Sequence, residues 1–318
     1  QKVIQKVIGQ NGKLEYSVVM DNGSASNQPY TVNVGGNKSG FNKSRVNGYD
    51  KYKNPQFIQE LASDSNLNPN YQFEFCKGFY PRIADGKMNG RVCRLLVSPL
   101  LLAMEQVLGP SDYLSFMKSF RYPLAGEFSF KRSLIPELRI SSDWGLEVGL
   151  LSEMQRNQAS NRICQIDIAD TYDHKHQDLS GDDRDFGLSR MSIDIVKVLI
   201  RKLATQGYSF GPETFRTLKA SYFRTALDMV RHYQTDAEVN GLSYDIDSEE
   251  RAVELFAENI MRAGSDFSYA PMETPFIPSW ARVKSAIPDI EYQLRRAVEA
   301  DNQELDTYLH VVPKMSAI

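Results

Sequence analysis

Three stretches of the chain show the pattern of apolar and polar positions that β-strands have. Residues 71–79 (YQFEFCKGF) and residues 162–170 (RICQIDIAD) alternate apolar and polar side chains. Residues 14–21 (LEYSVVMD) form a short apolar run that ends at Asp21 and is followed by the turn residues NGSASN. We therefore predict three strands, separated along the chain by segments of other periodicity.

Apolar residues three and four positions apart predict helices over much of the rest of the chain. The segment PLAGEFSFKRSLI opens as a strand or turn, and we expect it to become helical from Ser129. The segment ETPFIPSWARV, with its two prolines, is predicted to be an extended strap over another surface. We predict helices at residues 54–62, 95–108, 112–120, 145–157, 187–206, 212–235, 248–262 and 288–299.

This order of strands and helices predicts an α/β fold whose sheet is flanked by helices, with a helical C-terminal appendage. The appendage has an apolar face that could pack on the core or on a second subunit. Residues 28–54 are rich in Asn, Gly, Ser and Lys. That composition favours a flexible surface loop, and the alternative is a glycine-rich approach to a diphosphate.

Composition and charge exclude some classes of function. The 318 residues are 42% hydrophobic and 24% charged, which is ordinary for a globular protein with a proper core. The net charge of −3, without a Lys/Arg-dense stripe, argues against nucleic-acid binding. The three cysteines form no CxxC pair, and no apolar run reaches the roughly 18 residues of a membrane span. Because QKVIQKVIGQ also lacks a signal-peptide core, we expect a cytoplasmic protein that does not enter a membrane.

Two turns within residues 121–150 pair a glycine with a carboxylate, in the sequences AGEF and DWGLE. Gly126 and Gly145 let the backbone approach a ligand, or bend where a side chain would clash. Glu127 and Glu147 place an anion beside each bend. A Glu just inside a helix also caps free backbone N–H groups, so Glu147 fits a structural role as well as a binding role.

A basic turn follows the predicted strand at 71–79 and contains KMNGRVCR. Gly90 supplies a backbone bend, and Arg91 carries a planar guanidinium that suits a phosphate or a carboxylate. The alternative is a solvated basic loop.

Two histidines stand among aspartates in DIADTYDHKHQDLS, just past the predicted strand at 162–170. Ligands of α/β folds bind at the carboxyl ends of strands, and imidazole with carboxylates suits Mn²⁺ or Mg²⁺. His174 and His176 could instead lie in a solvated loop and bond to neighbouring aspartates. The second acidic cluster, DID at residues 245–247, reads as part of a polar linker, and we assign no metal to it.

In this order, GKMNGRVCRLLVSPLL, AGEF, DWGLE and DIADTYDHKHQDLS resemble the glucosyl-3-phosphoglycerate synthase family, which are retaining glycosyltransferases of the GT-A type. The resemblance covers about residues 68–204. It implies three portions: a shortened or divergent nucleotide-binding portion at 1–66, the transferase core with acceptor and metal sites at 67–186, and a helical region at 187–318.

The family's pattern assigns roles to individual residues. The loop that matches Gly90 and Arg91 grips the phosphate of phosphoglycerate in the family, and Cys93 here replaces the usual threonine of that loop, so one hydroxyl contact is lost. Glu147 matches a glutamate that lies between the substrates. We predict that it is the catalytic-site carboxylate and acts by positioning hydroxyl groups rather than as a nucleophile.

The resemblance also implies a metal and a donor site. His174 matches the histidine that completes the family's metal site. The Asp-x-Asp motif that begins this site in the family is not found in the corresponding place, where Asp50 is the acidic residue. We predict that Asp21, Gly126 and Glu127 contact the donor.

The resemblance therefore implies an enzyme that transfers glucose from a nucleotide sugar such as UDP-glucose to 3-phosphoglycerate, with retention and with Mg²⁺ or Mn²⁺. It also implies a homodimer. The alternative is a catalytically silent homologue that binds a sugar phosphate or assembles with a full-length transferase.

Overall fold

The computed structural model describes residues 2–8, 14–20, 30–32, 73–158, 162–167, 187–271 and 276–311. For the first three ranges it describes the course of the backbone only. The predicted helix at 54–62 lies outside the described residues.

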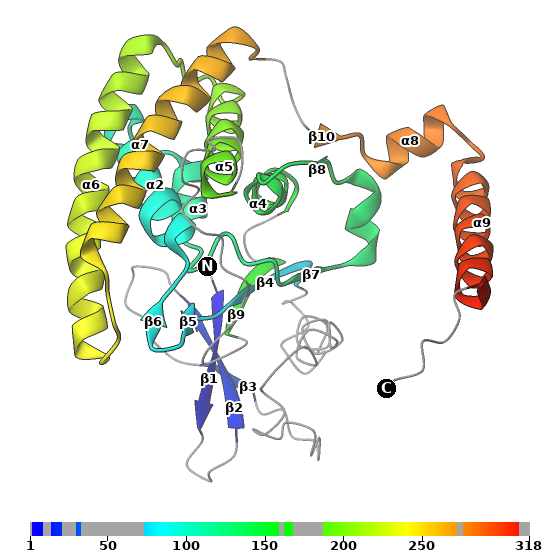
Figure 1. Cartoon of the computed structure of the whole chain (residues 1–318), viewed down its shortest axis with the longest axis horizontal. Helices are drawn as coiled ribbons and strands as arrows, with labels where there is room; N and C mark the ends of the chain where they lie inside the picture. Colours follow the sequence, from blue (N-terminus) through cyan, green and yellow to red (C-terminus); the bar gives the residue numbers. More distant parts are fainter. Residues whose placement is uncertain are drawn as a thin grey trace.

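A six-stranded mixed sheet with the order β3-β2-β1-β9-β4-β7 forms the base of the fold (Figure 1). Strand β9 is parallel to both β1 and β4, whereas the other neighbouring pairs are antiparallel. All three predicted strands are confirmed, with shorter bounds. The strands are β1 (Lys2–Ile8), β2 (Leu14–Met20), β3 (Tyr30–Val32), β4 (Phe75–Phe79), β7 (Phe128–Phe130) and β9 (Ile163–Asp167).

Helices cover the sheet, and four of them, α2, α5, α6 and α7, pack side by side (Figure 1). The α/β class, with a mixed sheet flanked by helices, is thereby confirmed. None of the described helices is long and apolar enough to cross a membrane. The helices are α2 (Ser98–Leu108), α3 (Asp112–Lys118), α4 (Leu146–Asn157), α5 (Gly187–Ala204), α6 (Pro212–Val239) and α7 (Ile246–Tyr269).

Local sequence explains where several helices begin and end. A π-helix, η3 (Val92–Val97), runs directly into α2, whose first turn contains Pro99. Proline is tolerated there because the backbone N–H groups of a first helical turn have no acceptor within the helix. Gly109 ends α2 with a φ of 87°, a conformation that favours glycine. The hydroxyl of Ser111 then accepts a hydrogen bond from the backbone N–H of Leu114 and caps α3.

One hydrophobic core joins the sheet to the helices before residue 158 and to helices α5, α6 and α7. It contains Phe75 of β4, Met104 of α2 and Leu151 of α4 together with Ile200 of α5 and Phe256 of α7, all fully buried or nearly so. Helices α5, α6 and α7 therefore share the core of the preceding residues rather than resting on its surface. The predicted boundary at residue 187 stays a prediction, and this core crosses it.

The prediction of a helix from Ser129 is wrong. This residue lies in β7, which pairs antiparallel with β4 through the register Phe75↔Phe130. The ring of Phe128 stacks on Phe75 at 6.1 Å and on Phe130 at 5.8 Å between centroids. A helical segment, the 3₁₀-helix η4 (Arg132–Glu137), begins only after the strand, because packing against β4 overrides local propensity.

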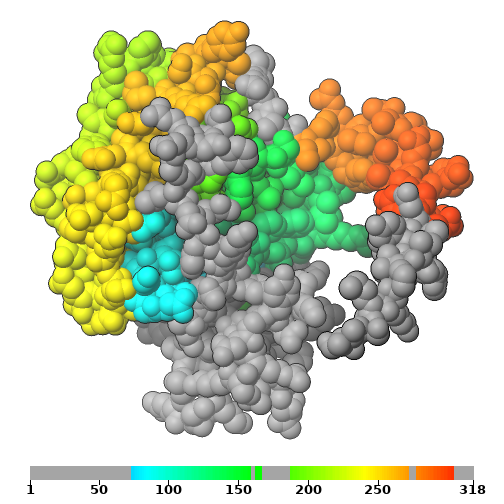
Figure 2. Space-filling model, in the orientation of Figure 1, coloured from blue at the N-terminus to red at the C-terminus, as the bar shows by residue number. Residues whose placement is uncertain are grey.

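The predicted strap is confirmed for Phe276–Ile277 and wrong for Trp280–Val283, which are helical, while residues 273–275 lie outside the described residues. Strand β10 (Phe276–Ile277) pairs antiparallel with β8 (Ile140–Ser141). After β10 the chain continues as α8 (Trp280–Ala286), which packs on η4, and then as α9 (Ile290–Val311). In Figure 2 the orange and red surface of α8 and α9 forms a lobe that joins the rest of the protein beside the green surface.

Candidate functional site

A cavity of about 600 Å³ lies between the segment 80–93, the AGEF turn, the start of α4 and the junction of α6 with α7. Its lining includes four aromatic side chains and charges of both signs. In Figure 2 the cyan surface of the first segment lies directly beside the yellow surface of α6 and α7. Six of the predicted site residues line this one cavity: Gly90, Arg91, Cys93, Gly126, Glu127 and Glu147.

A short hairpin leads into the predicted phosphate loop. Strands β5 (Ile83–Ala84) and β6 (Lys87–Met88) pair antiparallel, and Gly90 follows with a φ of 78°. A Cβ at Gly90 would come within 3.3 Å of the Arg82 side chain, so both conformation and space require glycine here. The turn delivers Arg91 to the start of η3. Because π-helical turns often occur at functional sites, the local geometry fits a binding loop.

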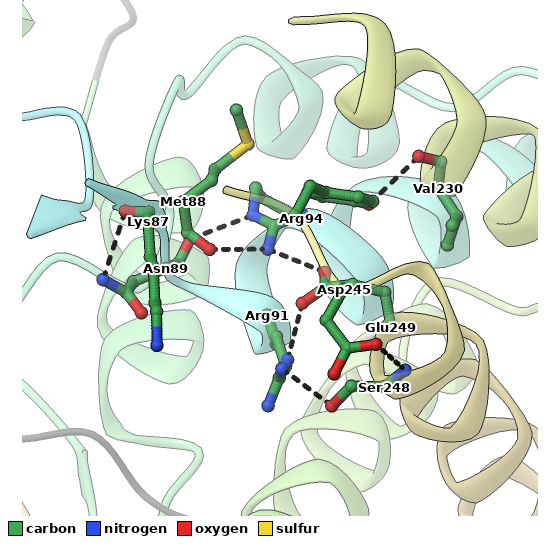
Figure 3. A network of polar contacts seen from close by, with 10 residues as sticks. Lys87, Met88, Asn89, Arg91, Arg94, Val230, Asp245, Ser248 and Glu249 are labelled. Carbon is green, nitrogen blue, oxygen red and sulfur yellow. Dashed lines mark hydrogen bonds and ion pairs between the residues drawn. The ribbon is translucent and has the colours of Figure 1, made fainter. Parts of the chain in front are cut away.

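The Arg91 guanidinium is held from the C-terminal half of the chain. Its Nε donates to Glu249 Oε1 at 2.7 Å, and its Nη2 donates to Ser248 Oγ at 3.0 Å (Figure 3). The Arg91 side chain is 30% exposed and lines the cavity. One edge of the guanidinium is therefore engaged by α7, and the remaining N–H groups are those that can serve a ligand.

Cys93 lies at the inner wall of the same cavity. It is buried, and burial raises the pKa of its thiol to about 12. The residue is therefore a neutral thiol at physiological pH, with little capacity to accept or donate strong hydrogen bonds.

Two carboxylates from other segments also line the cavity. Glu147 lies in the first turn of α4, and Glu127 lies just before β7. Burial raises the pKa of Glu147, its own backbone N–H and the charge of Lys77 oppose this rise, and the charge of Glu127 adds to it. Glu147 is thus a helix-start carboxylate that also lines the cavity, and its binding role stays a prediction.

Lys77 of β4 lies behind these carboxylates and is only 1% exposed. Its Nζ donates to the carbonyl oxygen of Ala125 and lies 5.3 Å from the centroid of the Phe128 ring. Burial lowers the pKa of Lys77 to about 8, and the charges of Glu147 and Glu127 oppose this fall. A buried cation therefore lies close to both cavity carboxylates.

The two glycines of the carboxylate turns have different roles. A Cβ at Gly126 would meet nothing within 4 Å, so the backbone there borders open space in the cavity. A Cβ at Gly145 would overlap Val198 of α5 and approach Asp143 Oδ1 at 3.0 Å. Gly126 thus leaves room for a ligand, whereas Gly145 lets α4 pack closely on α5.

The placement of DID in a polar linker is wrong. Asp245 is the N-cap of α7 and accepts a hydrogen bond from the Ser248 N–H at 3.1 Å. It also lines the cavity. Just before it, the Ser243 N–H donates to the Gly86 carbonyl at 2.8 Å, which holds the α6–α7 junction against the β5–β6 hairpin. Capping chemistry and this contact explain why a polar segment is ordered at the cavity.

Three predicted site residues, Asp21, Asp50 and His174, lie outside the described residues, as does His176. Within the described ranges, no group of three or more His, Cys, Asp or Glu side chains could hold a metal ion. The residues described here therefore do not form a metal site by themselves, and the predicted ligands stay predictions.

The sequence reasoning missed Glu249 and Lys77. Glu249 carries no signal of its own, because it stands in SEERAVELF as an ordinary carboxylate in the first turn of a helix. Lys77 does carry one, since it continues the strand positions of Phe73 and Phe75 two residues apart. A lysine in the buried register of a strand needs a partner, and this pattern points to the neighbouring carboxylates.

Comparisons with known proteins show what the whole chain is similar to. No protein-family model matches the chain. Over 238 residues, 75% of the chain, it is 42% identical to the glucosyl-3-phosphoglycerate synthase of Persephonella marina. The chain is a homologue of the glucosyl-3-phosphoglycerate synthases. This chain is also 41% identical to the synthase of Methanococcoides burtonii over 73% of this chain's length.

This relationship covers only part of the relatives. The chain spans 59% of the Persephonella synthase and 57% of the Methanococcoides synthase, so somewhat under three fifths of each is matched. The expected resemblance to glucosyl-3-phosphoglycerate synthases is confirmed.

Solved structures of related proteins overlap about half of the chain. Mannosyl-3-phosphoglycerate synthase from Rubrobacter xylanophilus is 26% identical with a TM-score of 0.36, and covers 50% of this chain and 45% of its own. Glucosyl-3-phosphoglycerate synthase from Mycobacterium tuberculosis, in complex with Mn²⁺, UDP-glucose and phosphoglyceric acid, is 23% identical with a TM-score of 0.34. The matched region covers 47% of this chain and 43% of the Mycobacterium tuberculosis chain.

Proposed function

We propose that the cavity binds 3-phosphoglycerate as the acceptor of a glucosyl group from a nucleotide sugar such as UDP-glucose, and that the product is glucosyl-3-phosphoglycerate with retained configuration. The observation that carries this proposal is that Arg91 and Glu147 line one cavity although 55 residues separate them along the sequence. The 42% identity to a protein named for this activity supports the same assignment.

The basic side of the cavity suits the acceptor. 3-Phosphoglycerate carries a phosphate at one end and a carboxylate at the other, so two separate cationic groups recognise it best. Arg91 offers its remaining N–H groups, and Lys87 and Arg82 line the same wall. In this proposal Arg91 and Gly90 bind the phosphate. The thiol of Cys93 fills the wall without a strong hydrogen bond.

The acidic side suits hydroxyl groups. A carboxylate accepts hydrogen bonds from sugar or acceptor hydroxyls and fixes their orientation before transfer. We assign this positioning role to Glu147, with Glu127 and Gly126 on the donor side of the cavity. The charge of Lys77 lowers the pKa of Glu147 and so favours the ionised form of that carboxylate.

A divalent cation, Mg²⁺ or Mn²⁺, belongs to this proposal through His174 and Asp50. A cation there would neutralise the charge that develops on the leaving diphosphate. Asp21 completes the proposed donor contacts. A homodimer is proposed as well, and light scattering of the purified chain checks it.

The experiment is calorimetric titration of the full chain with 3-phosphoglycerate and with UDP-glucose, in Mg²⁺ or Mn²⁺, followed by an assay for the glucosylated product. The Arg91→Met variant should lose at least tenfold in affinity for 3-phosphoglycerate. The matched control is Arg216→Met, because Arg216 is an exposed arginine of α6 that pairs only with exposed Glu213 in the described structure. It should bind as the unchanged protein does.

Three results are possible. Binding of both compounds with product formation supports the transferase. Binding without product supports the silent homologue, for which the missing Asp-x-Asp motif is the motivating observation. If 3-phosphoglycerate does not bind, or binds equally well to Arg91→Met, the assignment of this cavity is wrong.

A further inference from the structure

The carboxylate of Glu249 is shared by two arginines of η3. Its Oε1 accepts from Arg91 Nε at 2.7 Å, and its Oε2 accepts from Arg94 Nη2 at 2.8 Å. The Glu249 side chain is only 4% exposed. Figure 3 shows both guanidinium groups directed toward it. Glu249 thus links the loop at the cavity to α7.

The two arginines differ in how firmly they are fixed. The Arg94 side chain is 11% exposed, and its guanidinium donates to the carbonyls of Asn89 at 2.9 Å and Met88 at 3.3 Å. It also lies 4.8 Å from the centroid of the Tyr233 ring. The Arg91 side chain is 30% exposed, and the hydrogen bonds of its guanidinium drawn in Figure 3 all go to residues of α7. Glu249 therefore links a partly exposed arginine to a more deeply buried one.

We propose that Glu249 is a positioning residue that holds Arg91 in the orientation that binds the acceptor phosphate. This inference rests on the proposed function of Arg91. The carboxylate and Ser248 Oγ engage the Nε and Nη2 groups, so the far end of the guanidinium is presented to the cavity before a ligand arrives. An arginine that is ordered in advance loses less rotamer freedom on binding.

The charge balance agrees with this role. Two guanidinium groups share one carboxylate, so the cluster keeps a net positive charge beside the cavity. Asp245, at the start of the same helix, also lines the cavity. Its side chain caps the helix at Ser248 N–H rather than pairing with Arg91. The positive charge thus remains at the place where a phosphate would bind.

The test is the Glu249→Gln variant in the full chain, titrated with 3-phosphoglycerate by calorimetry. Glutamine keeps the shape but replaces one of the two carboxylate oxygens by an NH₂ donor, which would face a guanidinium donor, so it cannot reproduce both contacts. We expect the dissociation constant to rise about tenfold. The matched control is Glu213→Gln, which removes an exposed ion pair with Arg216 and should leave binding unchanged.

A double-mutant cycle separates positioning from a general structural effect. If Glu249 acts through Arg91, Glu249→Gln should change the dissociation constant less than twofold in an Arg91→Met background. A milder variant, Ser248→Ala, removes the second contact of Arg91 and should weaken binding about threefold. It provides the same readout if Glu249→Gln does not fold.

The outcomes are distinguishable. If the unchanged chain does not bind 3-phosphoglycerate, the proposed function and the inference both fall. If the unchanged chain binds, but the Glu249→Gln variant binds equally well, only the inference is overturned. The same holds if Glu249→Gln changes the dissociation constant equally with Arg91 and with Arg91→Met. A loss that disappears in the Arg91→Met background supports it. For Ser248→Ala, unchanged affinity counts against the inference in the same way.

Discussion

Replacing Lys77 by methionine should stabilise the protein at neutral pH. Lys77 is buried and has a lowered pKa, because burial disfavours its charged form more than Glu147 and Glu127 favour it. Methionine has a similar length and carries no charge. The variant therefore removes a buried cation while it keeps the volume of the side chain within the sheet.

The magnitude follows from the pKa of Lys77. A fall from 10.5 to about 8 corresponds to about 3 kcal/mol at about 1.4 kcal/mol for each pKa unit. Loss of the hydrogen bond to the Ala125 carbonyl offsets about 1 kcal/mol of this gain. We expect Lys77→Met to raise the free energy of unfolding by about 2 kcal/mol at pH 7.

The pH dependence gives the sharper test. Below about pH 8 the lysine is charged in both the folded and the unfolded chain, so the destabilisation by its burial is fully present. Between pH 8 and 10.5 the folded protein releases this proton first, so stability of the unchanged protein rises with pH. The advantage of Lys77→Met should therefore shrink by about 2 kcal/mol between pH 7 and pH 9.5.

Urea denaturation of both proteins at pH 7, 8, 9 and 9.5 measures this difference. Buried tyrosines with raised pKa values, such as Tyr122 and Tyr113, affect both proteins equally and cancel. Lys118→Met, which breaks a half-exposed pair with Glu105, is the control and should show a small, pH-independent change. If Lys77→Met is less stable at pH 7 and the difference does not vary with pH, the charged state assigned to Lys77 is wrong.

Three further predictions concern the core and the loop at the cavity. Gly264→Ala should destabilise the protein by about 1–3 kcal/mol in urea denaturation, because its Cβ would come within 2.7 Å of the Phe215 ring. Arg94→Met should lower the free energy of unfolding by about 3 kcal/mol, because it leaves buried Glu249 with one cation less, and thermal denaturation checks this. Native protein should not react with a thiol reagent at pH 8, whereas three thiols should react in denaturant, because all of these residues are buried: Cys76, Cys93 and Cys164.

The sequence predicts strands from alternation at β4 and β9 and from an apolar run followed by turn residues at β2. Strands β4 and β9 alternate over most of their length, and both lie in the middle of the sheet. Strand β1 was missed because KVIQKVI has apolar residues at positions 3, 4, 7 and 8, which is helical spacing. Strand β7 was missed because three residues give no period, and only the pairing with β4 defines it.

Some residues of the candidate site could be predicted from the sequence, and others could not. Arg91 and Glu147 could be predicted because each stands beside a glycine in a polar turn, where binding residues gather. Glu249 could not be predicted, because its importance arises from a contact 158 residues away along the sequence. The junction before α7 reads as a linker for the same reason, since a helix cap and one backbone bond to Gly86 place it at the cavity.

Charge pairing outside the cavity bears on the proposed binding of phosphoglycerate by this acidic chain. Four carboxylates line the cavity and would repel phosphoglycerate if they all acted on it: Glu127, Glu147, Asp245 and Glu249. Two cations that do not line it, Lys77 and Arg94, lie behind the carboxylates and oppose their charge. The positive groups that face the cavity are thereby left to act on a ligand. Removing either hidden cation should therefore weaken anion binding without removing any group that contacts the anion.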